Sequence, residues 1–477
     1  MIALLILTRT ASGTIWYVAT NGSDSASGTS TSTPFATPHR AVTNSALTAG
    51  DTIFVRGGTY VLSSKVAPGS SKVGTPGNYI KFWAYPDEHP VLDFNTMPES
   101  SDKALDMRRS YWHVKGIEVE NAPDSGILLG GSGVIVEGCI VHDCDNDGFI
   151  LGSSTLICSN ALILNCDSYR NYQVGSGGNN GDGFAGKAGC GPGNAFVGCR
   201  SYLNSDDGWD FYDSAAQHVV FTNCWAFMNG SNQWNIGSFT GNGNGYKLGG
   251  ASTSVGHTLV QCLAFDNRRK GFDYNNSVGA HTMVNCTGFR NGLENYKFPV
   301  VPSSGVNAFT NNISYLGGGI DIVAGSIQVS NSWQNGLSVS ASDFVSLDAS
   351  LAFVPRNADY SLPTNGFARL AAGSDMIDNG INVGLPFNGS APDLGAYEYV
   401  ALVLPQNIVI DAVSQTDTGL YLHVSGLTSH GNVIVHSSPD LATWTPIFTN
   451  PPVTGGWEYI DPAATNSPQQ FYKVQEQ

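Results

Sequence analysis

The central part of the chain consists of short runs in which apolar and polar residues alternate. Two examples are GVIVEGCIV (133–141) and HTLVQCLAF (257–265). Alternation with a period of two residues predicts short, half-buried β-strands. The repeated region lacks the 3.6-residue periodicity of amphipathic helices, and Gly and Asn recur throughout it. The pattern therefore predicts an all-β chain rather than a helical repeat.

Two sequence markers recur along this region and keep step with each other. One is a cysteine that is followed, in all copies but the first, by an asparagine five residues later. The other is a glycine followed by an aromatic residue. The cysteines are Cys139, Cys166, Cys199, Cys224, Cys262 and Cys286, the asparagines are Asn171, Asn204, Asn229, Asn267 and Asn291, and the glycines are Gly148, Gly183, Gly208, Gly245 and Gly271. The spacing defines a unit of about 25 residues, with insertions near 172–180 and 230–242.

A unit of this length cannot bury its apolar face alone, so the units must stack as coils. We therefore predict a parallel β-helix. Six cysteines in one rung position predict a ladder of buried free thiols, because stacked positions about 4.8 Å apart with parallel Cβ vectors suit disulfides poorly. The asparagines predict tight turns with left-handed backbone and amides that hydrogen-bond from coil to coil.

The ends of the chain differ from the repeats. The apolar MIALLIL lacks basic residues, and one interpretation is that residues 1–15 are a tail holding a clipped secretion signal. Residues 16–402 form the predicted β-helix domain, capped near its start by a short helix with Thr33 as N-cap and Pro34 at its first position. Residues 403–477 contain six short strand-like runs and predict a small β-sandwich-like module.

Composition limits the classes of partner. The formal net charge is −16, which argues against nucleic acid as a partner. Apolar residues make up 41% of the chain, so disorder is not expected. No apolar run is long enough to span a membrane, and we expect a secreted monomer. An acidic polymer would be repelled unless cations lie between it and the protein.

Polar residues concentrate beside the glycine markers, in coils that otherwise carry little charge. Asp182 and Asp206 are 24 residues apart, about one coil, and Asp207 and Asp210 share the corner with Asp206. Four converging carboxylates would repel one another unless a cation lies among them, and an all-oxygen ligand set favours Ca²⁺. Lys247 holds the rung position of Asp210 one coil further on. The insertions are expected to wall a cleft on either side of this patch.

This set of residues predicts β-elimination on an acidic polysaccharide. Ca²⁺ bound to the C6 carboxylate of a uronate sugar stabilises the charge that develops when the C5 proton is removed. A neutral lysine can remove that proton, and the 4-O glycosidic bond then breaks. Burial and a nearby cation lower a lysine pKa, so we expect an alkaline optimum.

Several segments resemble the polysaccharide lyase family 9 pectate lyases. They are GDGFAGK (181–187), NSDDGWDFYD (204–213) and GNGYKLGG (243–250), and the resemblance covers about residues 16–400. It implies a right-handed parallel β-helix, Ca²⁺ ligands at Asp182, Asp206, Asp207 and Asp210, and a Brønsted base at Lys247. Tyr246 stands where the family often has Phe. Lys187 and Arg269 are candidates to bind uronate carboxylates, with solvated surface charge as the alternative.

Other functions stay open at this point. Family members differ in substrate, so the enzyme is expected to cleave α-1,4-linked galacturonan or, alternatively, rhamnogalacturonan I. A β-helix glycoside hydrolase would need supporting histidines, and His218 and His257 fall outside the marked corner. A non-catalytic polysaccharide-binding protein would use the Asp cluster as a structural calcium site. Lys297, in register beyond Asp273, is a competing candidate for the base.

Overall fold

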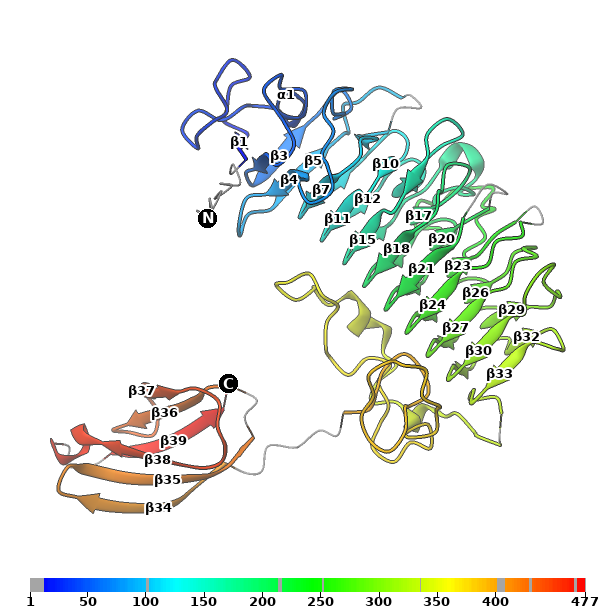
Figure 1. The fold of residues 1–477 in the computed structure, drawn as a ribbon. Helices are drawn as coiled ribbons and strands as arrows, with labels where there is room; N and C mark the ends of the chain where they lie inside the picture. The colour runs from blue at the N-terminus through cyan, green and yellow to red at the C-terminus, as the bar shows by residue number, and fades with distance from the viewer. Residues whose placement is uncertain are drawn as a thin grey trace, which may run out of the picture. The chain divides into compact units, whose positions relative to one another are not determined.

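The structure, a computed structural model, describes residues 13–99, 103–212, 217–250, 253–334, 336–400, 408–428, 431–466 and 470–476. The chain divides into two units, Met1–Tyr399 and Val400–Gln477. In the first unit the chain winds as a right-handed coil whose turns stack along one axis (Figure 1). Each complete turn contributes one strand to each of three parallel sheets. The predicted right-handed parallel β-helix is therefore confirmed.

The sheets run the length of the helix, and their strands follow in stacking order within the described residues. The first sheet contains β1 (Ile15–Val18), β2 (Thr52–Val55), β4 (Ile80–Ala84), β7 (Trp112–Lys115), β11 (Ile135–Glu137), β15 (Leu162–Leu164), β18 (Asn194–Val197), β21 (Val219–Thr222), β24 (Thr258–Val260), β27 (Thr282–Val284), β30 (Ala308–Thr310) and β33 (Ile327–Val329). The second contains β3 (Gly58–Val61), β5 (Pro90–Asp93), β8 (Glu118–Glu120), β12 (Ile140–His142), β16 (Asp167–Tyr169), β19 (Arg200–Tyr202), β22 (Trp225–Phe227), β25 (Leu263–Phe265), β28 (Thr287–Phe289) and β31 (Ile313–Tyr315). The third contains β6 (Leu105–Met107), β9 (Ile127–Leu129), β13 (Phe149–Leu151), β17 (Phe184–Ala185), β20 (Trp209–Asp210), β23 (Tyr246–Lys247), β26 (Phe272–Asp273), β29 (Tyr296–Phe298) and β32 (Ile320–Ile322). A small sheet pairs β10 (Gly131–Ser132) with β14 (Cys158–Ser159).

The cysteine marker forms the expected ladder inside the helix. All six marker cysteines are free and fully buried. Each is preceded by a residue with a positive φ angle, such as Asn165 before Cys166 and Gly198 before Cys199, where the chain turns from the first sheet into the second. The ladder therefore contributes packing of small apolar groups, and the turn before each cysteine explains the Gly and Asn that recur there.

The asparagine marker forms a hydrogen-bonded stack at the turn between the second and third sheets. The Asn171 amide nitrogen donates to Asn204 Oδ1 at 2.9 Å, and the Asn204 amide nitrogen donates to Asn229 Oδ1 at 2.9 Å. The stack continues through Asn267 to Asn291. The left-handed residue at this turn is the one before each asparagine, for example Leu203, so the expectation that these asparagines adopt left-handed backbone is wrong. Their buried amides instead satisfy the turn's polar groups.

The glycine marker is explained by close approach to this stack. A Cβ atom added to Gly183 would lie 1.9 Å from Ser201 Oγ and 2.9 Å from the Asn204 amide nitrogen. The aromatic residue that follows points into the core. Phe184, Trp209 and Tyr246 stack at centroid separations of 5.0 and 4.7 Å. Gly therefore admits the asparagine stack, while the aromatic ladder fills the interior of the third sheet.

We expect Asn229→Ala to lower the free energy of unfolding by about 1–3 kcal/mol, because it removes partners from buried amides on both neighbouring coils. Asn229 accepts from the Asn204 amide and donates to Asn267 Oδ1. Urea unfolding followed by circular dichroism measures this loss. Asn388→Ala, at an exposed position, is the control. Equal urea midpoints for the two variants would contradict a stabilising role for the stack.

The N-terminal helix begins later than the sequence suggested. Helix α1 spans Pro38–Val42, with Thr37 as N-cap and Pro38 at the first position. The backbone nitrogen of Arg40 donates to Thr37 Oγ1 at 3.2 Å. The expected cap at Thr33 and Pro34 is wrong, because the carbonyls of these two residues accept hydrogen bonds from Gly28 and Ser23 in the preceding loop. The same Thr-Pro signature occurs twice, and the loop selects the second copy.

The segment after β33 returns along the second sheet (Figure 1). It contains the 3-10 helices η2 (Ala341–Asp343) and η3 (Ala349–Phe353). Arg356 from this segment and Arg200 from β19 both pair with Asp167 of β16, at 2.6 Å each. The aromatic face of the second sheet, including Phe227 and Phe265, is buried against Phe367 and its neighbours. The segment thus covers apolar surface that the helix would otherwise expose.

The second unit is built from two antiparallel sheets. One contains β34 (Val409–Thr416), β35 (Gly419–Thr428) and β38 (Thr454–Asp461), and the other contains β37 (Thr445–Asn450), β36 (Val433–Ser438) and β39 (Phe471–Glu476). Val424, Leu427 and Val433 form a core to which both sheets contribute, as the β-sandwich-like prediction requires. Two further 3-10 helices are η1 (Val174–Ser176) in the first unit and η4 (Pro462–Asn466) in the second.

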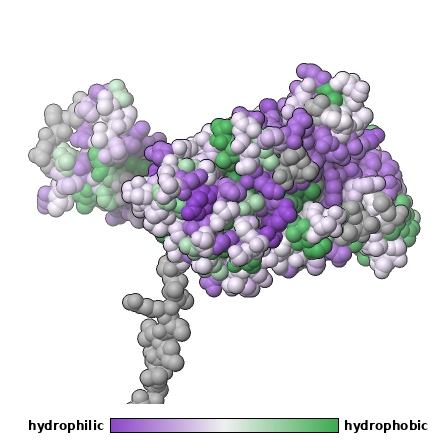
Figure 2. All heavy atoms as spheres, turned by 90° about the horizontal axis from the view of Figure 1, so that it is seen from above, coloured by the Kyte–Doolittle hydropathy of each residue, from purple (hydrophilic) through white to green (hydrophobic). Residues whose placement is uncertain are grey.

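On the face drawn in Figure 2, hydrophilic residues predominate and apolar residues lie scattered among them. Among the described residues, no helix is long and apolar enough to cross a membrane. The predicted N-terminal tail, residues 1–15, lies almost wholly outside the described residues.

Candidate active site and metal centre

The predicted site residues gather where the chain enters the third sheet. Asp210 in β20 is the register partner of Lys247 in β23, and Asp273 in β26 follows Lys247. Asp182 and Asp207 each stand directly before a marker glycine, at the start of this sheet. Stacked coils bring these positions together although 65 residues separate Asp182 from Lys247. The register inferred from the sequence is thus confirmed.

Three of the four predicted metal ligands form one tight group. One carboxylate oxygen from each of Asp182, Asp207 and Asp210 lies within 4.8 Å of the others. All three residues are buried, with exposed fractions of 0, 0 and 4%. The Asp207 backbone nitrogen donates to Asp182 Oδ1 at 2.9 Å, and the Asn244 backbone and side-chain nitrogens donate to Asp207 Oδ1. The Tyr212 backbone nitrogen donates to Asp210 Oδ1 at 2.8 Å.

Asp206 lies beside this group but is held differently. Its two oxygens accept hydrogen bonds from the backbone nitrogens of Asn180 and Asn242, which belong to the two insertions. Burial and the charge of Asp207 raise the pKa of Asp206 to about 7. The sequence could place Asp206 only at the same corner, whereas its contacts with the insertions depend on the fold.

Lys247 points into the carboxylate group. Its Nζ lies 3.0 Å from Asp207 Oδ2 and 3.3 Å from Asp210 Oδ2. The Tyr212 ring covers it, with the ring centroid 5.3 Å from Nζ. Burial lowers the pKa of Lys247, but Asp207 and Asp210 hold it above its ordinary value. The carboxylates thus oppose the lowering of the Lys247 pKa that burial and a nearby cation were expected to cause.

Lys187 is a second cation in the same group rather than a free surface charge. Its Nζ lies 3.2 Å from Asp182 Oδ2, 3.4 Å from Asp210 Oδ2 and 3.7 Å from Asp147 Oδ1. Asp147 is buried and was not among the predicted ligands. It precedes the marker Gly148 just as Asp182 precedes Gly183, and that register match was the signal that could have identified it.

The electrostatics and donor set of the group suit a bound divalent cation. Burial and the neighbouring carboxylates raise the pKa of Asp182. Lys187 therefore compensates only part of the negative charge on this carboxylate. Oδ2 of Asp207 and Oδ1 of Asp147 are buried, and the groups that the structure places beside them are the amines of Lys247 at 3.0 Å and Lys187 at 3.7 Å. Carboxylate oxygens are the donors that Ca²⁺ prefers. Asp182, Asp207 and Asp210 are therefore fit to hold such an ion, with Asp206 next to them.

The two insertions form a single wall beside the site. The Thr240 nitrogen donates to the Gly177 carbonyl at 2.8 Å, and the Tyr172 and Trp234 rings stack at 4.6 Å. The expectation that the two insertions flank the carboxylate patch on opposite sides is wrong. Both insertions occur at the same corner of their coils, and only one coil without an insertion lies between them, so the two insertions contact each other.

Arg269 lies outside the carboxylate group. Its Nη1 donates to Asn242 Oδ1 at 3.0 Å, and the residue is exposed. With Arg268 and Thr240 it lines a groove of about 410 Å³ next to the insertion wall. The structure therefore places Lys187 within the predicted site and Arg269 beside it. Lys297 lies two strands beyond Lys247 and pairs with Glu294 and Asp321.

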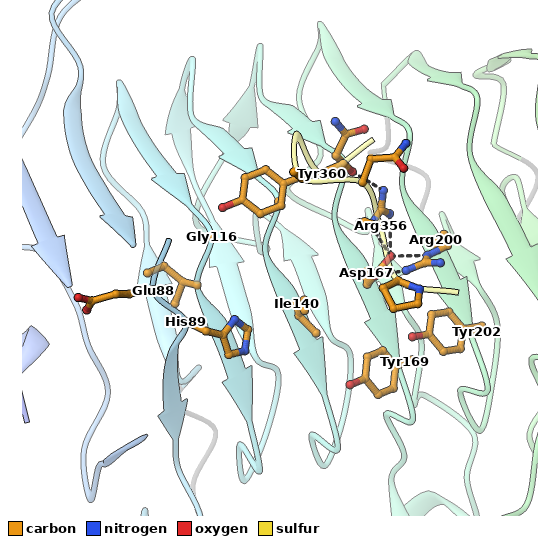
Figure 3. A pocket seen from close by; sticks show the side chains of 16 residues that line it. Glu88, His89, Gly116, Ile140, Asp167, Tyr169, Arg200, Tyr202, Arg356 and Tyr360 are labelled. Atoms are coloured by element: carbon orange, nitrogen blue, oxygen red, sulfur yellow. Dashed lines mark hydrogen bonds and ion pairs between the residues drawn. The ribbon is translucent and has the colours of Figure 1, made fainter. Parts of the chain in front are cut away.

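A pocket of about 350 Å³ lies elsewhere, between the second sheet and the returning segment (Figure 3). Asp167, Arg200 and Arg356 meet at one side of it. Burial raises the pKa of Asp167, but the two arginines hold it below its ordinary value. This ion-paired carboxylate fastens the returning segment to the helix, and it offers no unpaired base.

Comparison with known proteins shows the family of the chain. Residues 16–312 match the family model described as Pel9A-like, right handed beta helix region. Pectate lyase L of Dickeya dadantii (strain 3937) is 40% identical over 394 residues, covering 80% of this chain and 90% of that protein. Pectate lyase PEL9 of Emericella nidulans is 31% identical over 390 residues, covering 76% of this chain and 93% of that protein.

Two solved structures are also similar. The crystal structure of pectate lyase Pel9A matches with a TM-score of 0.75 and 39% identity, covering 80% of this chain and 96% of that one. A rhamnogalacturonan lyase matches with a TM-score of 0.66 and 27% identity, covering 76% of this chain and 97% of that one. Fold, site and relatives together define an enzyme of the polysaccharide lyase class. Within that class, the chain belongs to the Pel9A-like right-handed β-helix family.

Proposed function

We propose that this protein is a secreted, calcium-dependent pectate lyase that cleaves α-1,4-linked galacturonan by β-elimination. The observation that carries the proposal is a buried lysine amine, Lys247 Nζ, within 3.0–3.3 Å of Asp207 and Asp210 in a three-carboxylate cluster. The pectate lyases among its relatives support the substrate class.

In the proposed reaction, Lys247 acts as the base. Its neutral amine accepts the proton from C5 of a uronate unit. The electron pair of that C–H bond forms the C4–C5 double bond, the bond from C4 to the glycosidic oxygen breaks, and that oxygen takes a proton from solvent. General base catalysis of this kind contributes about 10²–10⁴-fold to a rate. The Tyr212 ring over Nζ limits access of water to the amine.

The carboxylates hold the cation that this chemistry requires. Asp182, Asp207 and Asp210 would ligate Ca²⁺, with Asp206 as the fourth ligand, as the sequence predicted. When bound, Ca²⁺ supplies positive charge that offsets these carboxylates and neutralises the C6 carboxylate of the sugar. Lys187 also neutralises part of the negative charge of Asp182 and Asp210. This arrangement lets a chain of net charge −16 bind an acidic polymer.

Rhamnogalacturonan I is the second candidate substrate, because a rhamnogalacturonan lyase shares the fold at 27% identity. In either case Lys187 and Arg269 are proposed to contact uronate carboxylates, Lys187 from within the cluster and Arg269 from the groove beside it. Both polymers present a uronate to the base. Contacts outside the carboxylate cluster therefore determine which polymer is the substrate.

We expect ultraviolet absorbance of a 4,5-unsaturated uronate to rise when the protein is incubated with polygalacturonate and Ca²⁺ at alkaline pH. The rise should be smaller on rhamnogalacturonan I and absent with EDTA on both. Faster product formation on rhamnogalacturonan I would assign that substrate instead. Depolymerisation without absorbance would indicate a hydrolase, and no depolymerisation of either polymer by folded protein would indicate a binding protein.

A further inference from the structure

A second cluster of metal-ligating side chains lies on the outer face of the second sheet, away from the third-sheet site. Glu118 and Glu120 extend from β8, and His142 extends from β12 on the next coil, in register with Glu120. One oxygen from each glutamate and one nitrogen of His142 lie within 4.8 Å of one another. His89, directly before β5, adds a group from the preceding coil.

The separations match those between the ligands of a tetrahedral ion. His142 Nε2 lies 3.1 Å from Glu118 Oε1 and 3.6 Å from Glu120 Oε2. Ligands about 2.0–2.1 Å from a tetrahedral Zn²⁺ lie about 3.4 Å from one another. His89 Nε2 lies 2.5 Å from Glu118 Oε2, the oxygen of Glu118 that His142 does not contact, and so holds this glutamate in place.

His142 is held in the orientation that a metal ligand needs. Its Nδ1 lies 2.7 Å from Asp143 Oδ2, and Arg170 fixes Asp143 at 3.0 Å. A carboxylate on one imidazole nitrogen selects the tautomer whose other nitrogen is free to bind a metal. The ring also stacks on Tyr169, with centroids 4.8 Å apart and planes 4° apart. His142 Nε2 is thereby aimed at the two glutamates.

The local charge also favours a cation. Three carboxylates, on Glu118, Glu120 and Asp143, surround His142, and Arg170 offsets only Asp143. A divalent ion beside Glu118 and Glu120 would compensate the charge of both glutamates.

The cluster is open to solvent on one side. The side chain of His89 is 59% exposed, whereas that of His142 is 10% exposed. His89 and Tyr169 are among the side chains lining the pocket between the second sheet and the returning segment (Figure 3). An ion can therefore enter by way of His89 and be held by the more buried groups.

We propose that Glu118, Glu120 and His142 form a three-ligand binding site for a divalent transition metal of the zinc type, with His89 supporting Glu118 from outside the site. Imidazole nitrogen among the donors favours Zn²⁺ over Ca²⁺, which prefers oxygen alone. The ligands come from two successive coils, through β8 and β12, so the bound ion cross-links these coils in the N-terminal part of the β-helix.

The test is calorimetric titration of Zn²⁺ into the metal-stripped full chain, with Ca²⁺ in excess. His142→Gln and Glu120→Gln remove ligands, and Asp207→Asn removes the third-sheet site. His113→Gln is the matched control, because His113 pairs with Glu137 at 2.9 Å but Lys115 occupies the other oxygen of that glutamate. We expect one Zn²⁺ site in the wild type, His113→Gln and Asp207→Asn proteins, and at least about 100-fold weaker binding in the ligand variants.

Thermal unfolding gives an independent readout. Zn²⁺ should raise the unfolding temperature of the wild-type protein and of the His113→Gln variant, but not that of the Glu120→Gln variant. Glu120 pairs with His142, and replacing it by Gln should leave the fold intact. Zn²⁺ affinity equal in Glu120→Gln and wild-type protein would overturn the proposal. Loss of the Zn²⁺ site in Asp207→Asn alone would overturn it as well, by assigning the ion to the third sheet.

Discussion

Replacement of Lys247 by alanine is expected to reduce the rate of β-elimination at least about 1,000-fold while leaving the fold and Ca²⁺ binding in place. The variant removes the amine that lies 3.0 Å from Asp207 and 3.3 Å from Asp210. Without it, nothing else in the described cluster replaces the base, because Lys187 is shared among Asp147, Asp182 and Asp210. Initial rates of ultraviolet absorbance on polygalacturonate measure the effect.

Lys297→Ala is the matched control, because Lys297 occupies the same register position two strands further along the third sheet. It pairs with Glu294 and Asp321 rather than with the buried cluster. Its replacement should change the rate little. If Lys297→Ala abolished activity and Lys247→Ala did not, the base would have to be reassigned to Lys297.

Asp207→Asn is expected to lower Ca²⁺ affinity at least about 100-fold. Loss of a residue that only supports a metal ligand costs about 10–100-fold in metal affinity, and Asp207 is itself a proposed ligand. Asp207 stands at the centre of the group, in contact with Asp182 through its backbone and with Lys247 through its side chain. Activity should fall in parallel and recover in part at high Ca²⁺ concentration. Calorimetry with Ca²⁺, alongside rates over a Ca²⁺ series, measures both effects.

Asp273→Asn controls for the loss of a buried carboxylate in the third sheet. Asp273 is 1% exposed and pairs with Lys270 at 3.0 Å, one strand beyond Lys247. We expect normal Ca²⁺ affinity and near-normal activity. Unchanged Ca²⁺ affinity in Asp207→Asn would show that the cation does not bind at the predicted cluster, whatever the activity of that variant.

The marker spacings predicted most of the fold. Each coil repeats the same types of residue at its turns. Gly or Asn usually precedes the marker cysteine, and the marker asparagine stands at the following turn. Both turns could therefore be recognised from the sequence, without knowledge of tertiary contacts. The same spacing placed Asp210 and Lys247 in register, and the structure bears this out. Asp147 was equally visible, directly before Gly148.

Contacts at the corners were not encoded in the spacing. The insertions near 172–180 and 230–242 meet each other and bind Asp206 through backbone nitrogens, which no side-chain pattern reveals. The pairing of Arg356 with Asp167 spans 189 residues and depends on the path of an irregular segment. The second-sheet cluster of Glu118, Glu120 and His142 was not predicted, because its two glutamates lie on a coil that precedes the first marker cysteine.

The sequence by itself determined the parallel β-helix, its coil length and the register that places the lysine beside its carboxylate partner on neighbouring strands. It could do so because a repeated coil is specified locally, by alternation within strands and by special residues at turns. Only the tertiary structure decided which carboxylates face one another, which cation each of them meets and how the insertions close over them. Those outcomes depend on side-chain directions and on long-range packing between coils, which residue spacing does not contain.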